Sequence, residues 1–475
     1  MSAAGLAEAR RRMVQHGESE EAVLAFERSY AELEDVIATG SGGTIPESTI
    51  DPLVDVPSLE DYDPTDDAMA AALRQVAMVK LNGGLGTSMG ITGPKSALVV
   101  KDDLSFLDVI ARQTLALRTE YGVQLPLILM NSFRTRDESL AILGRYPDLE
   151  IDGLPLDFLQ SAEPKLRADD LSPVDWPADP ELEWCPPGHG DVYLSLAATG
   201  LLKALLDKGF RYAFLSNADN LGATCDPRIA AWLVENDVPY VAEVCDRTVN
   251  DRKGGHLAVR KSDGQLVLRD SAMVEKQDEE QFQDYTRHTT FHANSLWVDL
   301  HALDALLTQS RERGEAGIGL PVIVNRKTVD PSDSSSTEVI QIETAMGGAV
   351  ARIDGARAIH VPRTRFRPVK TTNELLLVRS DIFELDDQSN IVSVITHAEP
   401  FVDLDKPYKL VPGFEQRFAK GAPSLREATS LRVEGDVTFG ADVVCIGDVT
   451  VRASAPATVP DGRRLTGVTT LEGAG

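Results

Sequence analysis

Hydrophobic and polar residues along the middle of the chain follow two alternating periods. Short apolar runs typical of buried strands cover residues 76–81, 125–130, 156–160, 212–215 and 240–244. Segments with the helical period lie between and after them, at residues 106–121, 138–146, 192–208, 228–235 and 300–313. Strands that alternate with helices form a mostly parallel sheet with helices on both faces. The pattern predicts an α/β fold whose functional residues follow the carboxyl ends of the strands.

The pattern changes after residue 254. Residues 256–260, 265–269 and 289–298 alternate as antiparallel strands do, and we expect them to cover one side of a site. Further along, residues 338–343 are typical of a strand that leads into a helix at residue 344. Two shorter apolar segments, 358–362 and 375–378, complete the central part of the chain.

The first 75 residues are acidic and show no strand pattern. Apolar residues at helical spacing predict one or two helices within residues 3–37. Residues 41–65 are rich in Gly, Pro, Ser and Asp, which is typical of a loop or linker. We interpret this part as a helical extension that packs on the main domain, with partner contacts as the alternative.

The C-terminal part repeats an apolar residue at every sixth position: Leu425, Leu431, Val437, Val443 and Val449. Small residues followed by Asp recur between them, and this combination is typical of a parallel β-helix. An ordinary meander of short strands is the alternative. The exposed sheet end of a small β-helix is a common place for subunits to meet, so a homo-oligomer through this domain is expected. The predicted division is 1–75, 76–380 and 381–475, with the hexads beginning near 425.

The net charge of −27 is the most unusual feature of the composition. It argues against nucleic acid or an anionic membrane as a partner, and a phosphorylated substrate would need a local group of positive side chains. Four scattered cysteines without a Cys-x-x-Cys pair give no zinc motif and fit a reducing cytoplasm. No signal peptide and no membrane-spanning run is evident, so we expect a cytoplasmic location.

A glycine-rich segment follows the first predicted strand. Residues 79–96 contain five glycines, Gly83, Gly84, Gly86, Gly90 and Gly93, and then Lys95. Glycines after a strand let backbone N–H groups approach a ligand closely, and a lysine beyond them can balance phosphate charge. The segment therefore predicts a nucleotide at the carboxyl end of the first strand, with a plain glycine-rich turn as the alternative.

Neither of the two common nucleotide-binding motifs fits this segment. The dinucleotide fingerprint Gly-x-Gly-x-x-Gly fails because Gly90 comes one residue too late after Gly84 and Gly86. The P-loop fails because Pro94 separates Gly93 from Lys95. The loop is therefore of a third kind.

Three further strings carry candidate binding residues. Residues 186–191 read Pro-Pro-Gly-His-Gly-Asp before a helix, which leaves the His189 ring accessible and favours an anion there. Residues 214–220 end a strand at Asp219, which could hold Mg²⁺ through one carboxylate plus substrate phosphates or could simply cap a turn. Asn294, within an alternating strand, offers a donor and an acceptor to a sugar hydroxyl pair, or else bonds a neighbour.

A cluster of basic residues precedes two threonines. Its members are Arg363, Arg365, Arg367 and Lys370. Basic runs are usually solvated, but in a chain this acidic the cluster is a natural partner for pyrophosphate. We also expect the strand end of residues 341–344 to lie near the residues that hold the sugar, with Glu343 as its only acid.

These motifs together resemble those of the UDP-glucose pyrophosphorylases of the eukaryotic type. Residues 81–90 and 93–96 match their Leu-Asn-Gly-Gly-Leu-Gly-Thr-Ser-Met-Gly and Gly-Pro-Lys-Ser segments, whereas the related UDP-N-acetylhexosamine pyrophosphorylases have Ala-Gly-Gly there. The strings Pro-Pro-Gly-His-Gly-Asp, Ser-Asn-x-Asp-Asn-Leu-Gly, Asn-x-Leu-Trp and Pro-Val-Lys-Thr-Thr also match. The strong motifs lie between residues 79 and 381. The chain departs from the family after Glu275, where it has Lys-Gln-Asp in place of Ile-Ala-Gln-Val-Pro.

The resemblance implies a nucleotidyltransferase domain of Rossmann-like, GT-A-like type and a role for each matched position. The nucleotide is expected to contact the glycine-rich loop and two later positions: Leu81, Asn82, Gly83, Gly84, Gln160 and Gly188. The sugar phosphate is expected to contact His189, Gly255, Glu275 and Asn294. The charged residues of catalysis would be Lys95, Lys370 and Asp219, with Asp219 also holding Mg²⁺.

The expected reaction is uridylyl transfer from UTP to glucose 1-phosphate, giving UDP-glucose and pyrophosphate. It would be Mg²⁺-dependent and reversible, without a protein nucleophile, and would act by positioning and charge neutralisation. Two alternatives stay open: a pyrophosphorylase for UDP-galactose or UDP-N-acetylhexosamine, and a non-catalytic sensor of nucleotide sugars. The joint presence of Lys95, Asp219 and Lys370 argues against the sensor, which would not need the phosphate charges.

Overall fold

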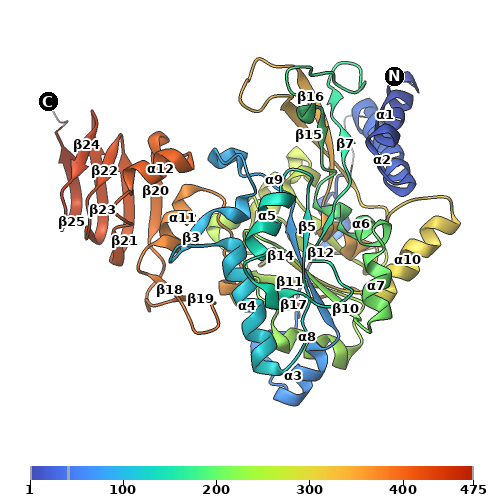
Figure 1. Ribbon diagram of the computed structural model, residues 1–475, viewed down its shortest axis with the longest axis horizontal. Helices are drawn as coiled ribbons and strands as arrows, with labels where there is room; N and C mark the ends of the chain where they lie inside the picture. The colour runs from blue at the N-terminus through green and yellow to red at the C-terminus, as the bar shows by residue number, and fades with distance from the viewer. Residues whose placement is uncertain (1–2, 40–42, 473–475) are drawn as a thin grey trace.

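The computed structural model describes residues 3–39 and 43–472. Residues 1–2, 40–42 and 473–475 of the predicted segments lie outside this range. Figure 1 shows a central sheet covered by helices, with the first two helices and the last strands toward opposite ends of the molecule. Within the described ranges, no helix combines the length and apolarity needed to cross a bilayer.

The central sheet has seven strands among the described residues, in the order β17-β11-β14-β10-β2-β5-β6. Their bounds in that order are Arg357–His360, Tyr240–Asp246, Thr290–Asp299, Tyr212–Asn217, Val76–Asn82, Leu127–Asn131 and Asp157–Leu159. All pairs are parallel except the two that β14 makes with β10 and β11. The fold is therefore a mixed α/β fold around a mainly parallel sheet, as predicted.

The place of β14 differs from the prediction. It was expected beside the strands of residues 256–269, but it is antiparallel in the middle of the central sheet. Its Trp297 packs against Phe214 of β10, with ring centroids 4.6 Å apart. Alternation of apolar residues predicts a strand but not its neighbours, and here burial of a large aromatic pair accompanies the central position.

The sheet separates two hydrophobic cores. Along β2, Val76 and Met78 face one core while Ala77 and Val79 face the other, as strand geometry requires. Helices α3 (Asp66–Leu73), α4 (Phe106–Tyr121), and α8 (Pro227–Asn236) supply residues to the first core, and α6 (Val192–Ala198), α7 (Leu201–Asp207) and α10 (Leu300–Glu312) to the second. Burial on both faces explains why the strands are continuous apolar runs.

Local signals fix several helix ends. Helix α4 occupies the predicted residues because Ser105 and Asp108 form a capping box at its start and Gly122, at φ 59°, ends it. The predicted helix of residues 192–208 is instead two helices, because Gly200 takes a left-handed conformation at φ 78°. The predicted helix of residues 138–146 is α5 (Arg136–Leu143).

Helices α1 (Ala3–His16) and α2 (Glu20–Thr39) pack on a second sheet rather than on the central one. This sheet has the order β15-β16-β8, with bounds Val322–Thr328, Glu338–Thr344 and Leu166–Arg167. Figure 1 shows β15 and β16 beside both helices. Strand β15 was not predicted, and its side chains are mostly half-buried or exposed, which explains the weak alternation in its sequence.

The predicted loop of residues 41–65 contains regular structure in its described part. Strand β1 (Ile50–Pro52) pairs antiparallel with β12 (His256–Arg260), which pairs with β13 (Leu266–Arg269). The prediction of an unstructured linker is therefore wrong for these residues. A three-residue strand that contains proline gives too short a pattern to be recognised without its partner.

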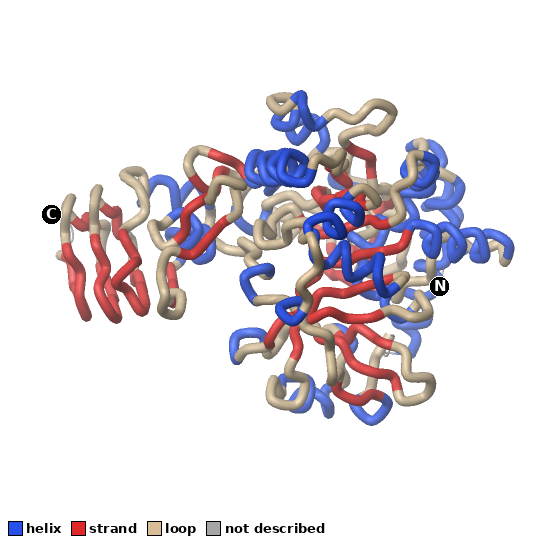
Figure 2. The backbone as a smooth tube through the Cα atoms, turned by 90° about the horizontal axis from the view of Figure 1, so that it is seen from below, coloured by secondary structure: helices blue, strands red, loops and turns tan. Residues whose placement is uncertain are grey.

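The C-terminal strands pair in parallel. One sheet has the order β20-β21-β23-β25 and another pairs β22 with β24; their bounds in that order are Phe401–Leu404, Ser424–Glu434, Val444–Ala453, Arg464–Leu471, Val437–Phe439 and Ala457–Val459. The five apolar residues of the hexads are fully buried. Two helices and a hairpin precede or flank these strands. The helices are α11 (Thr372–Arg379) and α12 (Val411–Arg417), and the hairpin joins β18 (Phe383–Leu385) to β19 (Ile391–Ser393). Figure 2 shows these strands stacked at the C-terminal end, apart from the central sheet.

Candidate active site

A cavity of about 780 Å³ opens where the carboxyl ends of β2, β5 and β10 meet. Nine of the predicted site residues line it: Leu81, Asn82, Gly83, Gly84, Lys95, Gln160, Gly188, His189 and Asp219. Its size is within the range of small-molecule sites. Because β2, β5 and β10 are parallel neighbours, their following loops meet at one edge of the sheet.

Polar side chains form hydrogen bonds between the start of the glycine-rich loop and the segment of β5 and α5. The Asn82 amide donates hydrogen bonds to Asn131 Oδ1 and Ser139 Oγ, both at 2.7 Å. The Ser132 hydroxyl donates to the Gly83 carbonyl at 2.9 Å. The loop therefore begins from a fixed point at the sheet edge, so its backbone can be preorganised for a ligand.

Two glycines of the loop differ in their surroundings. A Cβ atom on Gly83 would lie 2.2 Å from the Gln160 amide nitrogen, so a larger residue there would displace the Gln160 side chain. A Cβ on Gly84 would meet no atom within 4 Å, because Gly84 faces the open cavity. Gly83 thus allows close packing with Gln160, and Gly84 leaves the backbone accessible to a ligand.

Lys95 and Asp219 form an ion pair in the wall of the cavity. The Lys95 Nζ lies 2.6 Å from Asp219 Oδ2, and the side chains are only 18% and 22% exposed. The other carboxylate oxygen, Asp219 Oδ1, is buried and has no hydrogen-bond partner in the part of the chain that the structure describes. A buried unpaired acceptor is costly, so this oxygen is suited to a cation or a donor that arrives with a ligand.

His189 presents a donor from a fixed ring. Its Nδ1 accepts a hydrogen bond from the Met346 backbone N–H at 3.0 Å, which leaves Nε2 as the protonated nitrogen. Burial lowers the pKa of His189 below its usual value, so the ring is neutral at neutral pH. Gly188 before it has φ 81°, and a Cβ there would lie 2.6 Å from the Thr344 carbonyl oxygen, so this turn requires glycine.

The basic cluster is not a group of free cations. Each of its three arginines is within 2.8 Å of an acid: Arg363 of Asp251, Arg365 of Glu243 and Arg367 of Glu399. Glu243 is fully buried, which makes its bidentate pair with Arg365 a structural ion pair. None of the three arginines lines the cavity, so the structure does not bring them to the predicted site residues.

Lys370 is different from the arginines. It is exposed, and among the described residues no hydrogen bond or ion pair involves its side chain. It does not line the cavity, but it follows Val369, whose N–H donates to the Asp219 carbonyl at 3.2 Å. Its backbone thus lies next to the loop of Asp219.

The other three predicted sugar residues also lie outside the cavity lining. Asn294 is half-buried with φ 54°, at an irregularity in the pairing of β14 with β11, where bulges commonly redirect a side chain. The Gly255 carbonyl accepts from the His292 N–H at 3.0 Å, and burial, with a smaller effect of His189, lowers the pKa of His292 to about 4. Glu275 is half-buried and accepts from Gln277 at 2.7 Å.

Several cavity residues had no recognisable signal in the sequence. Three cations besides Lys95 line it, Arg134, Lys165 and Lys327, and so do the aromatic residues Phe133 and Trp184. Gln341 and Glu343, expected nearby, line it as well. No group of three metal-binding side chains occurs within the described ranges. A metal at this site would therefore need ligands from a bound molecule in addition to Asp219.

Comparison with known proteins shows the family of this chain. The family model described as UTP–glucose-1-phosphate uridylyltransferase matches residues 27–445. The enzyme of that name from Solanum tuberosum is 39% identical over 396 residues, 82% of this chain and 80% of the relative, and that of Saccharomyces cerevisiae is 38% identical over 384 residues, 80% and 74%.

Solved structures extend the similarity over nearly the whole chain. A UDP-glucose phosphorylase of Trypanosoma brucei is 40% identical, with a TM-score of 0.87 over 98% of this chain and 99% of its own. A mutant UDP-glucose pyrophosphorylase of Leishmania major in complex with UDP-glucose is 38% identical, with a TM-score of 0.87 over 99% and 100%. The chain belongs to the UTP–glucose-1-phosphate uridylyltransferase family.

Proposed function

We propose that this chain transfers a uridylyl group from UTP to glucose 1-phosphate, giving UDP-glucose and pyrophosphate. The relatives carry the name of this activity, and one similar structure holds UDP-glucose. The observation that supports it best is the Lys95–Asp219 pair inside a cavity that also contains Gly84 and His189. A nucleotide phosphate beside this pair would meet the Lys95 cation, and a metal ion bound to that phosphate would meet the unpaired Asp219 Oδ1.

The proposed arrangement uses each side of the cavity for one substrate. The uracil would lie against Gly83, Gly84, Gln160, and Gly188, with Leu81 and Asn82 beneath it. The α-phosphate would lie next to Lys95, and the His189 Nε2–H would donate to the phosphate of glucose 1-phosphate. An oxygen of that phosphate attacks the α-phosphorus in line while pyrophosphate leaves opposite, so the chain needs no nucleophile of its own.

Mg²⁺ fits the Asp219 carboxylate. Its Oδ1 is buried and unpaired among the described residues, and Mg²⁺ in proteins is commonly held by one or two carboxylates together with substrate phosphates. Bound there, the ion would neutralise phosphate charge. Lys95 and Lys370 would supply the remaining positive charge, with Lys370 directed to the departing pyrophosphate.

The hexose would lie on the side of His189 that faces away from the uracil, next to Gly255, Glu275 and Asn294. This choice follows the family resemblance and the contacts of Gly255 with the strand of Asn294. Galactose and N-acetylhexosamine phosphates are the alternative substrates, since the residues after Glu275 depart from the family. A sensor without activity is disfavoured because it would not need the paired charges of the cavity.

The remaining proposals concern organisation. We infer three domains, 1–75, 76–380, and 381–475, with α1 and α2 as a helical extension.

Parallel pairing of β21, β23, and β25, with buried hexad residues, supports a small β-helix at the C-terminal end. Strand β25 has one paired neighbour and an exposed Val468, which suits a homo-oligomer contact. Four buried, unpaired cysteines fit a reducing cytoplasm.

The experiment that tests the function measures pyrophosphate release with UTP and a panel of sugar 1-phosphates. We expect the highest kcat/KM with UTP and glucose 1-phosphate, and little activity when ATP replaces UTP. Equal or higher kcat/KM with galactose or N-acetylglucosamine 1-phosphate would favour the alternative substrates. Binding of UDP-glucose without any turnover would favour the sensor.

Replacing the metal carboxylate tests the role of Asp219. Asp219→Asn keeps the shape but removes the charge, so we expect turnover to fall on the order of a hundredfold or more and to depend less on Mg²⁺ concentration. Asp207→Asn, which changes an exposed carboxylate paired with Lys203, is the matched control. Native turnover of Asp219→Asn at every Mg²⁺ concentration would remove this residue from the site.

Lys370→Ala tests whether the cation acts in the transition state. Charge develops there on the departing pyrophosphate, so turnover should fall by about a hundredfold, or about 3 kcal/mol, while the KM for UTP changes far less. Lys370→Arg should restore activity only in part, because a planar guanidinium does not replace an ammonium. Lys203→Ala is the control for loss of an exposed lysine. A raised KM for UTP with native turnover would make Lys370 a ground-state anchor instead.

A further inference from the structure

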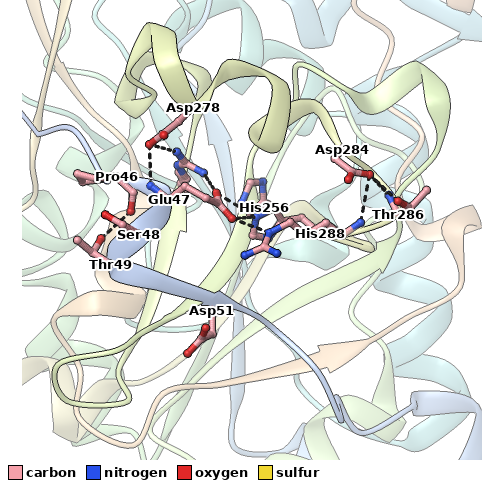
Figure 3. A network of polar contacts seen from close by, with 12 residues as sticks. Pro46, Glu47, Ser48, Thr49, Asp51, His256, Asp278, Asp284, Thr286 and His288 are labelled. Carbon is pink, nitrogen blue, oxygen red and sulfur yellow. Dashed lines mark hydrogen bonds and ion pairs between the residues drawn. The ribbon is translucent and has the colours of Figure 1, made fainter.

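A buried network of polar contacts surrounds Glu47, a residue outside the cavity (Figure 3). Its carboxylate forms an ion pair with Arg269, accepts from Arg287 Nε at 2.7 Å and accepts from His288 Nε2 at 3.1 Å. The Glu47 backbone N–H donates to Asp278 Oδ2 at 2.7 Å. Glu47 is only 12% exposed and Arg269 is completely buried, so the two charges depend on each other.

The segment of residues 43–52, here the N-terminal strap, runs along the loop of residues 270–278. The Ile45 N–H donates to the Met273 carbonyl at 2.9 Å, and the Thr44 hydroxyl donates to Glu275 Oε1 at 3.5 Å. Beyond Glu47, the strap continues as β1, which pairs with β12. The strap therefore joins the loop that carries Glu275 to the strand that begins directly after Gly255.

The network also reaches the backbone at Gly255. His288 stacks on His256, with ring centroids 3.9 Å apart, and Arg247 bonds both the His256 ring at 3.2 Å and the Gly254 carbonyl at 3.1 Å. Burial lowers the pKa of His256 to about 2 and that of His288 below its usual value. Both rings are thus neutral at neutral pH. The positive charge that faces Glu47 therefore comes from Arg269 and Arg287.

We propose that Glu47 is a positioning residue for the sugar side of the active site. The inference rests on the proposed assignment of Gly255 and Glu275 to the hexose. Both residues lie outside the central sheet and outside the lining of the nucleotide cavity. Pairing within the central sheet therefore does not fix the loop of Glu275, whereas the strap contacts that loop at three points through Thr44, Ile45 and Glu47.

The test compares Glu47→Gln with the native chain in the full reaction. Glu47→Gln keeps the side-chain shape but removes the charge that pairs with Arg287 and that compensates Arg269 together with Asp278. A substitution far from the reacting atoms that moves a bound substrate by about an ångström can lower the rate by about a hundredfold. We expect a lower kcat/KM for glucose 1-phosphate, mainly through its KM, with an unchanged KM for UTP and unchanged calorimetric affinity for UTP alone.

Asp51→Asn is the matched control in the same strap. Asp51 is 62% exposed, lies 3.6 Å from Lys261 and points away from the network in Figure 3. It should leave both KM values as in the native chain. If Glu47→Gln lowers the melting temperature but leaves the KM for glucose 1-phosphate native, the residue is structural only and the proposal is wrong.

Milder variants keep the test decisive if Glu47→Gln does not fold. Glu47→Asp retains the charge, and Arg287→Gln removes a partner that is 42% exposed. Both should raise the KM for glucose 1-phosphate less than Glu47→Gln would, and native values in both would overturn the proposal. Failure of the proposed function is distinguishable, because then the native chain itself would release no pyrophosphate from UTP and glucose 1-phosphate.

Discussion

The ion pair between Lys95 and Asp219 depends on the parallel pairing of β2 with β10. Leu81 pairs with Asn217 in that register, so the loops that follow the two strands leave the sheet at the same edge. An antiparallel β10 would place Asp219 at the opposite edge, out of reach of Lys95. In the free protein each charge compensates the other. A phosphate that takes Lys95 as its partner would leave the Asp219 carboxylate without a cation, and the proposed Mg²⁺ would fill that place.

The local charge of the cavity is the opposite of the charge of the whole chain. The net charge is −27, yet Arg134, Lys165 and Lys327 line the cavity together with Lys95. Lys165 is buried, donates to the Val329 carbonyl at 3.1 Å, and has its pKa lowered by burial. These cations satisfy the requirement that an acidic protein must gather positive side chains where it holds phosphates. The arginines near Lys370 do not contribute, because none of them lines the cavity.

Much of the fold and the centre of the site could be predicted because their signals are local. Apolar runs with helical segments between them predict β2, β5 and β10, and glycine strings predict the loops at their ends. Long-range pairing could not be predicted in the same way. The central position of β14, the pairing of β1 with β12, and the acids opposite the arginines of the basic cluster all join residues far apart in the sequence. The role proposed for Glu47 could not be predicted from the sequence for the same reason, since its partners follow it by more than 200 residues.

A crystal structure of the chain with UDP-glucose tests the account most directly. We expect the uracil against Gly83, Gly84 and Gln160, the diphosphate within hydrogen-bond distance of Lys95, and the hexose between His189 and the loop that carries Glu275. Asp219 should face the diphosphate. A diphosphate that contacts neither Lys95 nor Asp219, or a hexose that contacts neither His189 nor the loop of Glu275, would contradict the arrangement proposed for this active site.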